Sequence, residues 1–170
     1  MDYNIDTLFY DRVGYNGGKE FISPKEEIKE ISFYGLYSFR VDLINVNTEK
    51  RILQYGQKAA TVTLNSFKEI DAIRKVRILS LDKDWTDVSI KENGVNEKLY
   101  GAVYKIELLK SNDANFNQPA KTNLSLLANF GLNVELKYTE FVIPYNFVIA
   151  GFHGQSGSRI DKIGLILERV

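Results

Sequence analysis

The sequence of 170 residues predicts an all-β fold, from the alternation of its residues and from its turn chemistry. Apolar and polar residues alternate through 39–44 and 132–138, a pattern that places one face of a strand in a core and the other in water. Asn-Gly at 93–94 separates two strand-like runs, and this pair is the usual type I′ hairpin turn. Short strands separated by turns are typical of a sandwich, a barrel or a prism.

Further segments support strands, and two segments leave a helix open. Residues 61–64, 141–143 and 163–167 are rich in β-branched and aromatic residues, which favour strands. Capping-box patterns at 23–26 and 66–69 make a single helical turn an equal alternative at each place. Residues 111–121 form the most loop-like stretch of the chain.

A weak internal repeat runs through the chain. Residues 28–33, 103–108 and 160–165 share apolar residues at their first, fourth and sixth positions, and residues 73–78 are similar. Amphipathic strands resemble one another by chance, so the pattern has an ordinary explanation. A threefold arrangement of small sheets would also explain it.

Charge and composition exclude several classes of function. Lys+Arg and Asp+Glu both number 22, so the formal net charge is zero, which argues against a broad electrostatic grip on nucleic acid or an anionic membrane. The chain has no cysteine, hence no disulfide or thiolate metal site. No apolar run approaches the ~20 residues that span a bilayer, so we expect no membrane insertion.

The chain is expected to form one domain over residues 1–170, with 1–9 as a loose N-terminal extension. Its first residues lack the apolar stretch of a secretory signal peptide, and both a secreted and a cytoplasmic location stay open.

The C-terminal part carries a glycine pattern that suits a binding loop. Gly151, Gly154 and Gly157 recur every three residues between two apolar stretches, and Asp161 follows Gly157 by four. Glycines bring bare backbone amides to a surface. Sugar hydroxyls donate to carboxylates and accept from amides, so this loop is well matched to a sugar. The spacings of a dinucleotide-binding loop and of a nucleophile elbow are absent.

The segment GFHGQSGSRIDKIGLIL, residues 151–167, closely resembles the C-terminal segment of jacalin-related lectins. Residues 14–21 resemble the family's N-terminal glycine-rich loop, and 62–73 its middle-repeat strands. The resemblance covers roughly residues 10–170. It implies a β-prism I fold, with three four-stranded Greek-key sheets around a pseudo-threefold axis. It also implies that both glycine segments meet in one site and that no metal or other cofactor is needed.

The resemblance implies a non-covalent carbohydrate site on Gly17, Gly18, Gly157, Ser158, Arg159 and Asp161. By that match, the Asp161 carboxylate accepts hydrogen bonds from two adjacent sugar hydroxyls, and the amides of the two residues after Gly157 donate to the sugar. The glycine pair approaches from the other side. The other two repeats hold Lys29 and Tyr104 at the aspartate position, so we expect one site per chain.

The resemblance also favours a mannose/glucose-type site. Galactose-preferring members are cleaved before the second glycine of the pair and carry aromatic residues in the sugar loop, whereas this chain continues through Gly18 and has Ser158 and Arg159. Residues 79–98 look longer than the matching family loop. Their Trp85 either packs against its own loop or extends the site by stacking on a pyranose face. Useful avidity from one weak site per chain implies a homodimer or a larger oligomer.

Other interpretations stay open beside this one. Asp161 can serve its own loop, the glycine pair can be only a turn, and His153, the sole histidine, is expected to be a hydrogen-bonded loop residue. The domain can be a glycan-targeting module of a larger toxin or enzyme, or a β-prism scaffold for protein interactions without sugar activity. A glycosidase needs two carboxylates about 5–9.5 Å apart, and nothing in the sequence pairs them, so we expect no enzyme.

Overall fold

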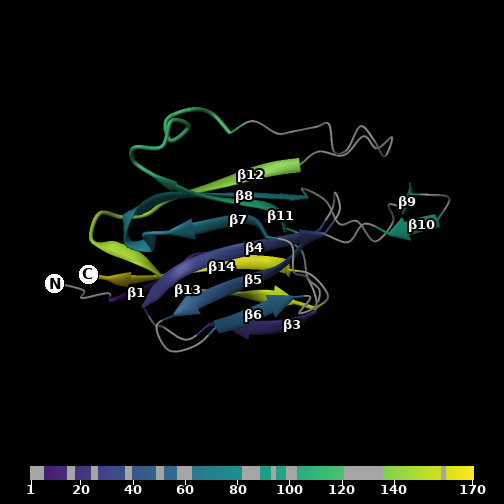
Figure 1. Ribbon diagram of the computed structural model, residues 1–170, viewed down its shortest axis with the longest axis horizontal. Coiled ribbons are helices and arrows are strands. Elements are labelled where there is room, and N and C mark those ends of the chain that lie inside the picture. The colour runs from purple at the N-terminus through teal and green to yellow at the C-terminus, as the bar shows by residue number, and fades with distance from the viewer. Residues whose placement is uncertain are drawn as a thin grey trace.

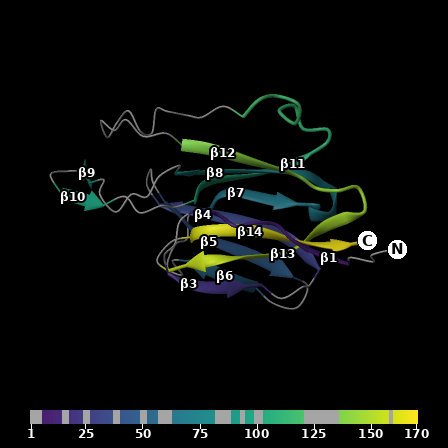
Figure 2. The ribbon, with the colours of Figure 1, turned by 180° about the vertical axis from the view of Figure 1, so that it is seen from behind.

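The computed structural model describes the residues 6–14, 18–23, 27–36, 40–48, 52–56, 63–81, 89–92, 95–98, 103–120, 136–157 and 160–170. Three antiparallel sheets surround one core, and a two-stranded hairpin projects from one end of the molecule (Figure 1). Both chain ends lie at the opposite end, as the view from behind also shows (Figure 2).

The first sheet brings the two ends of the chain together. Strands β13 (Phe147–Ser156) and β14 (Ile160–Arg169) form its central hairpin, and β3 (Lys19–Ile22) pairs with β13. Strands β1 (Thr7–Phe9) and β2 (Val13–Gly14) follow one another along β14 and so fill a single strand position. The sheet therefore has four positions. Because β1 pairs with β14, its residues belong to this sheet rather than to the loose N-terminal extension expected from the sequence.

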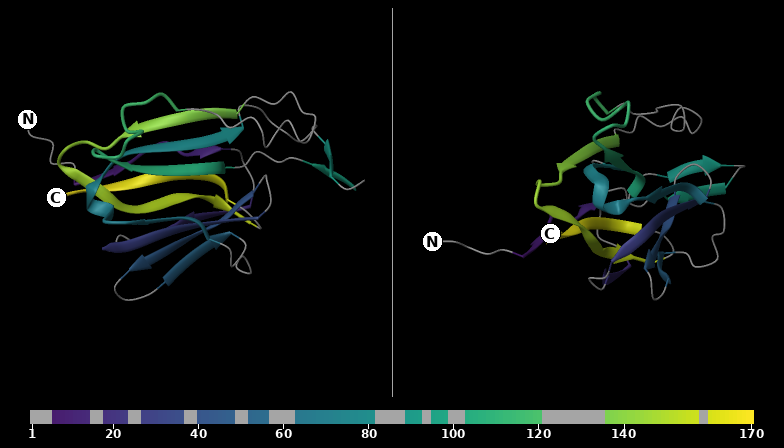
Figure 3. Two further views of the ribbon diagram at one scale, coloured as in Figure 1. Left: turned by 45° about the horizontal axis from the view of Figure 1, so that its top comes forward. Right: turned by 60° about the vertical axis from the view of Figure 1, so that its left-hand side comes forward.

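The second sheet runs in the order β6-β5-β4-β7, with β4 (Ile28–Leu36), β5 (Arg40–Thr48), β6 (Ile52–Gly56) and β7 (Thr63–Lys68). The third runs in the order β11-β8-β12, with β8 (Ile73–Leu81), β11 (Val103–Lys110) and β12 (Leu136–Val142). The predicted all-β prism is confirmed (Figure 3). Among the described residues the third sheet has three strands where the resemblance implied four.

The projecting hairpin consists of β9 (Ser89–Glu92) and β10 (Val95–Lys98). Val95 pairs with Glu92, so two residues connect the strands, at the position of the predicted Asn-Gly turn. The hairpin is therefore confirmed, while the turn residues themselves lie outside the described residues.

The weak sequence repeat corresponds to the core of the prism. Its three copies lie in β4, β11 and β14, one in each sheet. Their first, fourth and sixth residues are all buried and belong to one apolar cluster: Ile28, Ile31, Phe33, Val103, Ile106, Leu108, Ile160, Ile163 and Leu165. Burying one such side chain stabilises a fold by about 1.5–3 kcal/mol, so the repeated positions are where the three sheets are held together.

Neither capping box begins an α-helix in the part of the chain that the structure describes. Ser66 lies in β7, and its hydroxyl donates to the carboxylate of Glu30 on the adjacent strand β4. One turn of 3-10 helix, η1 (Ile70–Ala72), follows it. The Ser23 hydroxyl accepts a hydrogen bond of 2.7 Å from the backbone N–H of Phe152, while residues 24–26 lie outside the described residues. At Ser66 a cross-strand partner therefore replaces the local cap.

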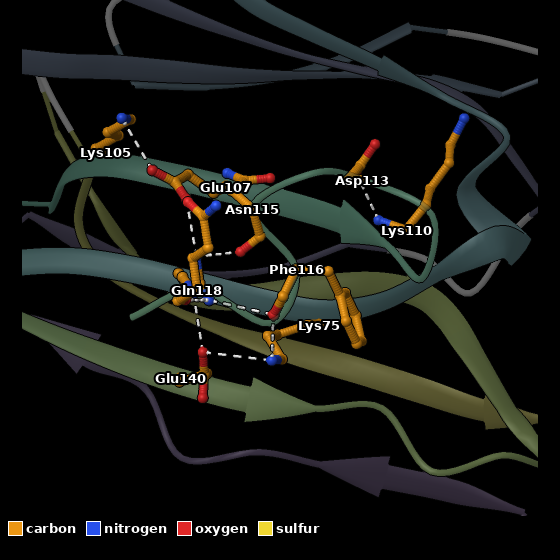
Figure 4. Close-up of polar contacts among 10 residues, drawn as sticks. Lys75, Lys105, Glu107, Lys110, Asp113, Asn115, Phe116, Gln118 and Glu140 are labelled. Carbon is orange, nitrogen blue, oxygen red and sulfur yellow. Dashed lines mark hydrogen bonds and ion pairs between the residues drawn. The ribbon is translucent and has the colours of Figure 1, made fainter. Parts of the chain in front are cut away.

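The outer face of the third sheet carries a buried arginine. Arg77 of β8 lies in register between Glu107 of β11 and Glu140 of β12 and is only 3% exposed. Its Nε donates to Glu140 at 2.8 Å, and its Nη1 lies 3.8 Å from the Glu107 carboxylate. The guanidinium also donates to three carbonyls of residues 111–118, which we call the strap (Figure 4).

Neighbouring contacts hold the strap in place. Lys75 donates to the carbonyl of Phe116 at 2.7 Å, and its Nζ lies 4.3 Å from the centre of the Phe116 ring. The Asp113 carboxylate accepts a hydrogen bond of 2.7 Å from the backbone N–H of Lys110 at the end of β11. Arg77 and Lys75 therefore donate hydrogen bonds to carbonyls of the strap and hold it against the outer face of the third sheet.

We expect Glu140 to make stability depend on acidic pH. The hydrogen bond from Arg77 holds the pKa of Glu140 below its ordinary value of 4.5. The ionised carboxylate therefore stabilises the fold fully above pH 4.5, and this contribution is lost as the pH falls through the folded-state pKa. Thermal melts between pH 7 and pH 3 should show Glu140→Gln less stable than the wild type at pH 7 and equal to it at the acidic end. A gap that stays constant with pH would contradict this.

Candidate functional site

The two glycine-rich segments meet at one end of the first sheet. Gly14 of β2 pairs with Lys162 of β14, and Lys19 of β3 pairs with Ser156 of β13. Strands β2 and β3 therefore flank the β13–β14 hairpin on its two sides, near its tip. This tip lies at the end of the molecule away from the chain ends (Figure 1).

Gly18 packs directly on the end of β13. Its φ is +66°, and a Cβ there would lie 2.4 Å from the carbonyl carbon and oxygen of Ser156 and 2.7 Å from the Gly157 nitrogen. Both glycines are exposed, and a Cβ on Gly157 would lie 3.6 Å from the Gly18 Cα. Only glycine fits at position 18, and the absence of side chains leaves backbone open to solvent on both segments.

Asp161 sits in a β-bulge beside this contact. Gln155 pairs with Lys162 and Ser156 with Ile160, so Asp161 is the extra residue of β14. Bulges re-aim side chains and are frequent beside functional sites. Asp161 is 6% exposed and has polar interactions of its own.

Gly14 packs on the backbone of Asp161 from the other side. Its φ is +125°, and a Cβ there would lie 2.1 Å from the carbonyl oxygen of Asp161. Gly14 is the first glycine of the N-terminal segment, and it was not among the residues expected to form the site. Strand β2 therefore supports Asp161 while Gly18 supports the tip of the hairpin.

Three lectins of known structure have a fold similar to that of this chain. No protein-family model matches the sequence, and no curated protein sequence is detectably similar to it. The fold is similar to wild-type Malaysian banana lectin, at 18% identity over 96% of this chain and 99% of that chain, with a TM-score of 0.56. It is similar to single-chain recombinant jacalin at 13% identity over 98% and 97%, with a TM-score of 0.57. A lectin described as mannose-binding, from champedak, is similar at 12% identity over 97% and 99%, with a TM-score of 0.55.

The chain has the fold of the jacalin-related lectins. The expected resemblance is thus confirmed at the level of structure, and these low identities establish a shared fold only.

Within the jacalin-related fold, several of the expected site residues are not placed. Gly17, Ser158, Arg159 and Trp85 lie outside the described residues. Of the six residues of the expected site, the structure brings together Gly18 and Gly157 and places Asp161 beside them. The β9–β10 hairpin, which follows the segment with Trp85, projects from the same end of the molecule as the β13–β14 tip (Figure 3).

His153 is a hydrogen-bonded residue, as expected, although it lies in strand β13 and not in a loop. Its Nε2 is 2.7 Å from the carbonyl oxygen of Tyr10, and the ring of Phe9 meets it edge-on at a centroid distance of 5.4 Å. Because a carbonyl only accepts, Nε2 carries the hydrogen and donates it.

The described ranges contain neither a metal-binding cluster nor a membrane-spanning helix. There, no group of three or more His, Asp or Glu residues is arranged to hold a metal ion. No helix in the same ranges is long and apolar enough to cross a membrane.

Proposed function

We propose that the protein is a lectin that binds carbohydrate non-covalently and leaves it chemically unchanged. The site is formed by the N-terminal glycine pair Gly17-Gly18 and by the loop Gly157–Asp161. The observation that carries this proposal is the contact of Gly18 with the end of β13, next to the bulge that holds Asp161. The backbones of two exposed glycines lie there beside the strand residue that would supply the carboxylate.

The chemistry of these groups suits a sugar. A carboxylate accepts hydrogen bonds from adjacent hydroxyls more strongly than a neutral acceptor does, and backbone amides donate to the sugar oxygens. In this proposal Asp161 is the acceptor, and the amides of Gly18, Ser158 and Arg159 are the donors. A shallow site of this kind binds a monosaccharide at roughly millimolar concentration, about 4 kcal/mol. Several sites on a homodimer or larger oligomer then supply avidity.

The proposed specificity is for mannose/glucose-type glycans. It is supported by the continuous chain through Gly18 and by the non-aromatic residues Ser158 and Arg159 in the loop. The champedak protein, which shares the fold, is described as a mannose-binding lectin. Trp85 is proposed to extend the site, supported by the position of the β9–β10 hairpin at the same end of the molecule.

One observation favours a second candidate, a β-prism scaffold for protein interactions without sugar activity. Asp161 is only 6% exposed and already has polar interactions within the protein. A carboxylate in that position can serve the bulge alone. The two candidates differ in what removal of the carboxylate does.

We expect Asp161→Asn to lose mannoside binding in a folded protein. The amide keeps the shape of the side chain but removes a charged acceptor, so affinity for methyl α-mannoside should fall at least about tenfold, the effect of a hydrogen bond to a charged group. Calorimetric titration with methyl α-mannoside, and with methyl α-galactoside as contrast, measures this beside thermal melts. A wild type that gives no heat with either sugar, with a variant that only melts earlier, would favour the scaffold.

A further inference from the structure

Residues 10–12 connect β1 to β2 and pass over the outer face of β14 at Gly164; we call them the crossing. The Tyr10 backbone N–H donates to the Leu165 carbonyl at 3.0 Å, so the chain still follows the sheet edge at that point. A Cβ built on Gly164 would lie 2.7 Å from the Tyr10 oxygen and 3.2 Å from the Arg12 Cα. Ile163 and Leu165 point into the core, so the position of Gly164 faces outward. The missing side chain of Gly164 is what lets residues 10–12 come this close.

His153 holds this crossing from the neighbouring strand. It is paired with Gly164 in the register of β13 and β14, so its ring projects from the same face. Its Nε2–H donates to the Tyr10 carbonyl at 2.7 Å, and the same nitrogen would lie 2.8 Å from a Cβ on Gly164. The imidazole therefore occupies the space that the glycine leaves, and it binds the segment that passes over it.

Two residues of the crossing, Tyr10 and Arg12, join it to the rest of the fold. Arg12 lies 3.3 Å from the carboxylate of Glu20 on β3, which ties together the two arms that flank the hairpin. Glu20 is 73% exposed, so this ion pair contributes little by itself. The Tyr10 ring stacks on Phe141 at 5.4 Å, and its hydroxyl donates to the Val142 carbonyl at 3.2 Å.

We infer that His153 is a positioning residue of the glycan site, an inference that rests on the proposed function. By holding the Tyr10 carbonyl it fixes the path of the chain into β2, where Gly14 supports Asp161. The chain continues from β2 to Gly18, which contacts the tip of the β13–β14 hairpin. His153 does not touch the sugar in this arrangement. Its loss frees the crossing and spreads the positions of the Gly18 amide, while the core, which lies on the other face of the sheet, stays intact.

The test compares His153→Leu with His153→Gln. Leucine keeps the apolar contact with Phe9 but cannot donate, whereas the glutamine amide donates from the same reach as Nε2. Affinity for methyl α-mannoside should fall about fivefold in His153→Leu, as for the loss of one hydrogen bond, and return to within about twofold of wild type in His153→Gln. The melting temperature of His153→Leu should fall by no more than about 2–4 °C, the effect of one lost hydrogen bond, and that of His153→Gln should stay close to wild type. Hydrogen exchange of residues 10–18 without sugar should be faster in His153→Leu only.

A second variant tests the same crossing from the opposite strand. Gly164→Ala places its Cβ against the Tyr10 carbonyl and His153, so it should lower affinity and speed exchange in residues 10–18 in the same way. Wild-type affinity and exchange in both His153→Leu and Gly164→Ala would overturn the positioning role and leave the lectin function standing. A wild type that binds no sugar would overturn the lectin function and the role of His153 with it.

Discussion

Replacing Gly14 by alanine is expected to destabilise the protein strongly and to abolish glycan binding. The φ of +125° is one that side chains rarely adopt, and the new Cβ would lie 2.1 Å from the Asp161 oxygen and 2.9 Å from the Lys162 Cα. Both obstacles are backbone atoms, so no side-chain rotation relieves them. Strain of this kind costs roughly 3 kcal/mol, which lowers the melting temperature of a domain of this size by about 6–12 °C. Asp161 has to move with β14, so binding is lost together with stability.

Gly157→Ala is the matched control for the loss of stability, since Gly157 itself belongs to the proposed sugar loop. Its Cβ would lie 3.6 Å from the Gly18 Cα, an ordinary contact, and its φ is not positive. We expect a change in stability within about 1 kcal/mol in either direction. Thermal melts and mannoside titration of both variants measure the difference. Equal melting temperatures for Gly14→Ala and wild type would show that β2 can move without loss of stability and does not support Asp161.

The fold could be predicted from features that act over short distances along the chain. The repeated apolar positions of β4, β11 and β14 proved to be the core, because a residue that alternates inward in a strand meets the same interior wherever that strand lies. The Asn-Gly pair predicted the β9–β10 hairpin, because the type of a two-residue turn depends on those two residues alone. At residues 66–69 the sequence left a helical turn open, and the structure instead places Ser66 in β7 with its hydroxyl donating to Glu30 on β4.

The candidate site could be predicted only in part. The residue types of Gly18, Gly157 and Asp161 suggested sugar binding, and the resemblance to a family assigned them to one site, but neither showed how closely the two segments pack. Gly14 was missed because its role is set by the Asp161 backbone, 147 positions away, and not by its neighbours in sequence. The bond from His153 to Tyr10 spans 143 residues, which no local pattern records.

The contacts between the strap and the third sheet could not be predicted from the sequence, which indicated only a loop at these residues. Its anchor, Arg77, lies in a strand whose apolar positions dominate the pattern, and its partners are 30, 41 and 63 residues away, in Glu107, Gln118 and Glu140. A charged residue at an outward position normally predicts contact with water. Here the strap covers that position, and the charge is buried.

Replacing Arg77 by alanine is expected to cost the protein about 3–5 kcal/mol, the usual cost of removing one partner from a buried ion pair. The loss leaves Glu107, which is 17% exposed, with Lys105 at 2.9 Å but without its arginine, and it removes the donor to the Gln118 carbonyl at 2.5 Å. Arg77→Lys should recover only part of the stability, because a lysine ammonium cannot reproduce the fork that serves two carboxylates and three carbonyls. Urea denaturation measures the three proteins.

Arg169→Ala is the control for this second prediction, because its ion pair with Asp6 spans 3.9 Å with both side chains at least 36% exposed. Such a pair contributes about 0–1 kcal/mol, and the contact of the guanidinium with the Phe147 ring, 4.9 Å from the ring centre, about 0.5–1 kcal/mol, so Arg169→Ala should lose much less stability than Arg77→Ala. Limited proteolysis tests where in the fold stability is lost. It should cut the strap at residues 111–118 faster in Arg77→Ala than in Arg169→Ala. If Arg77→Ala were as stable as Arg169→Ala, the outer face of the third sheet would have to be solvated, and the strap would contribute no stability to the prism. The low exposure of Arg77 argues against that outcome, since a guanidinium withdrawn from water needs the partners that the strap provides.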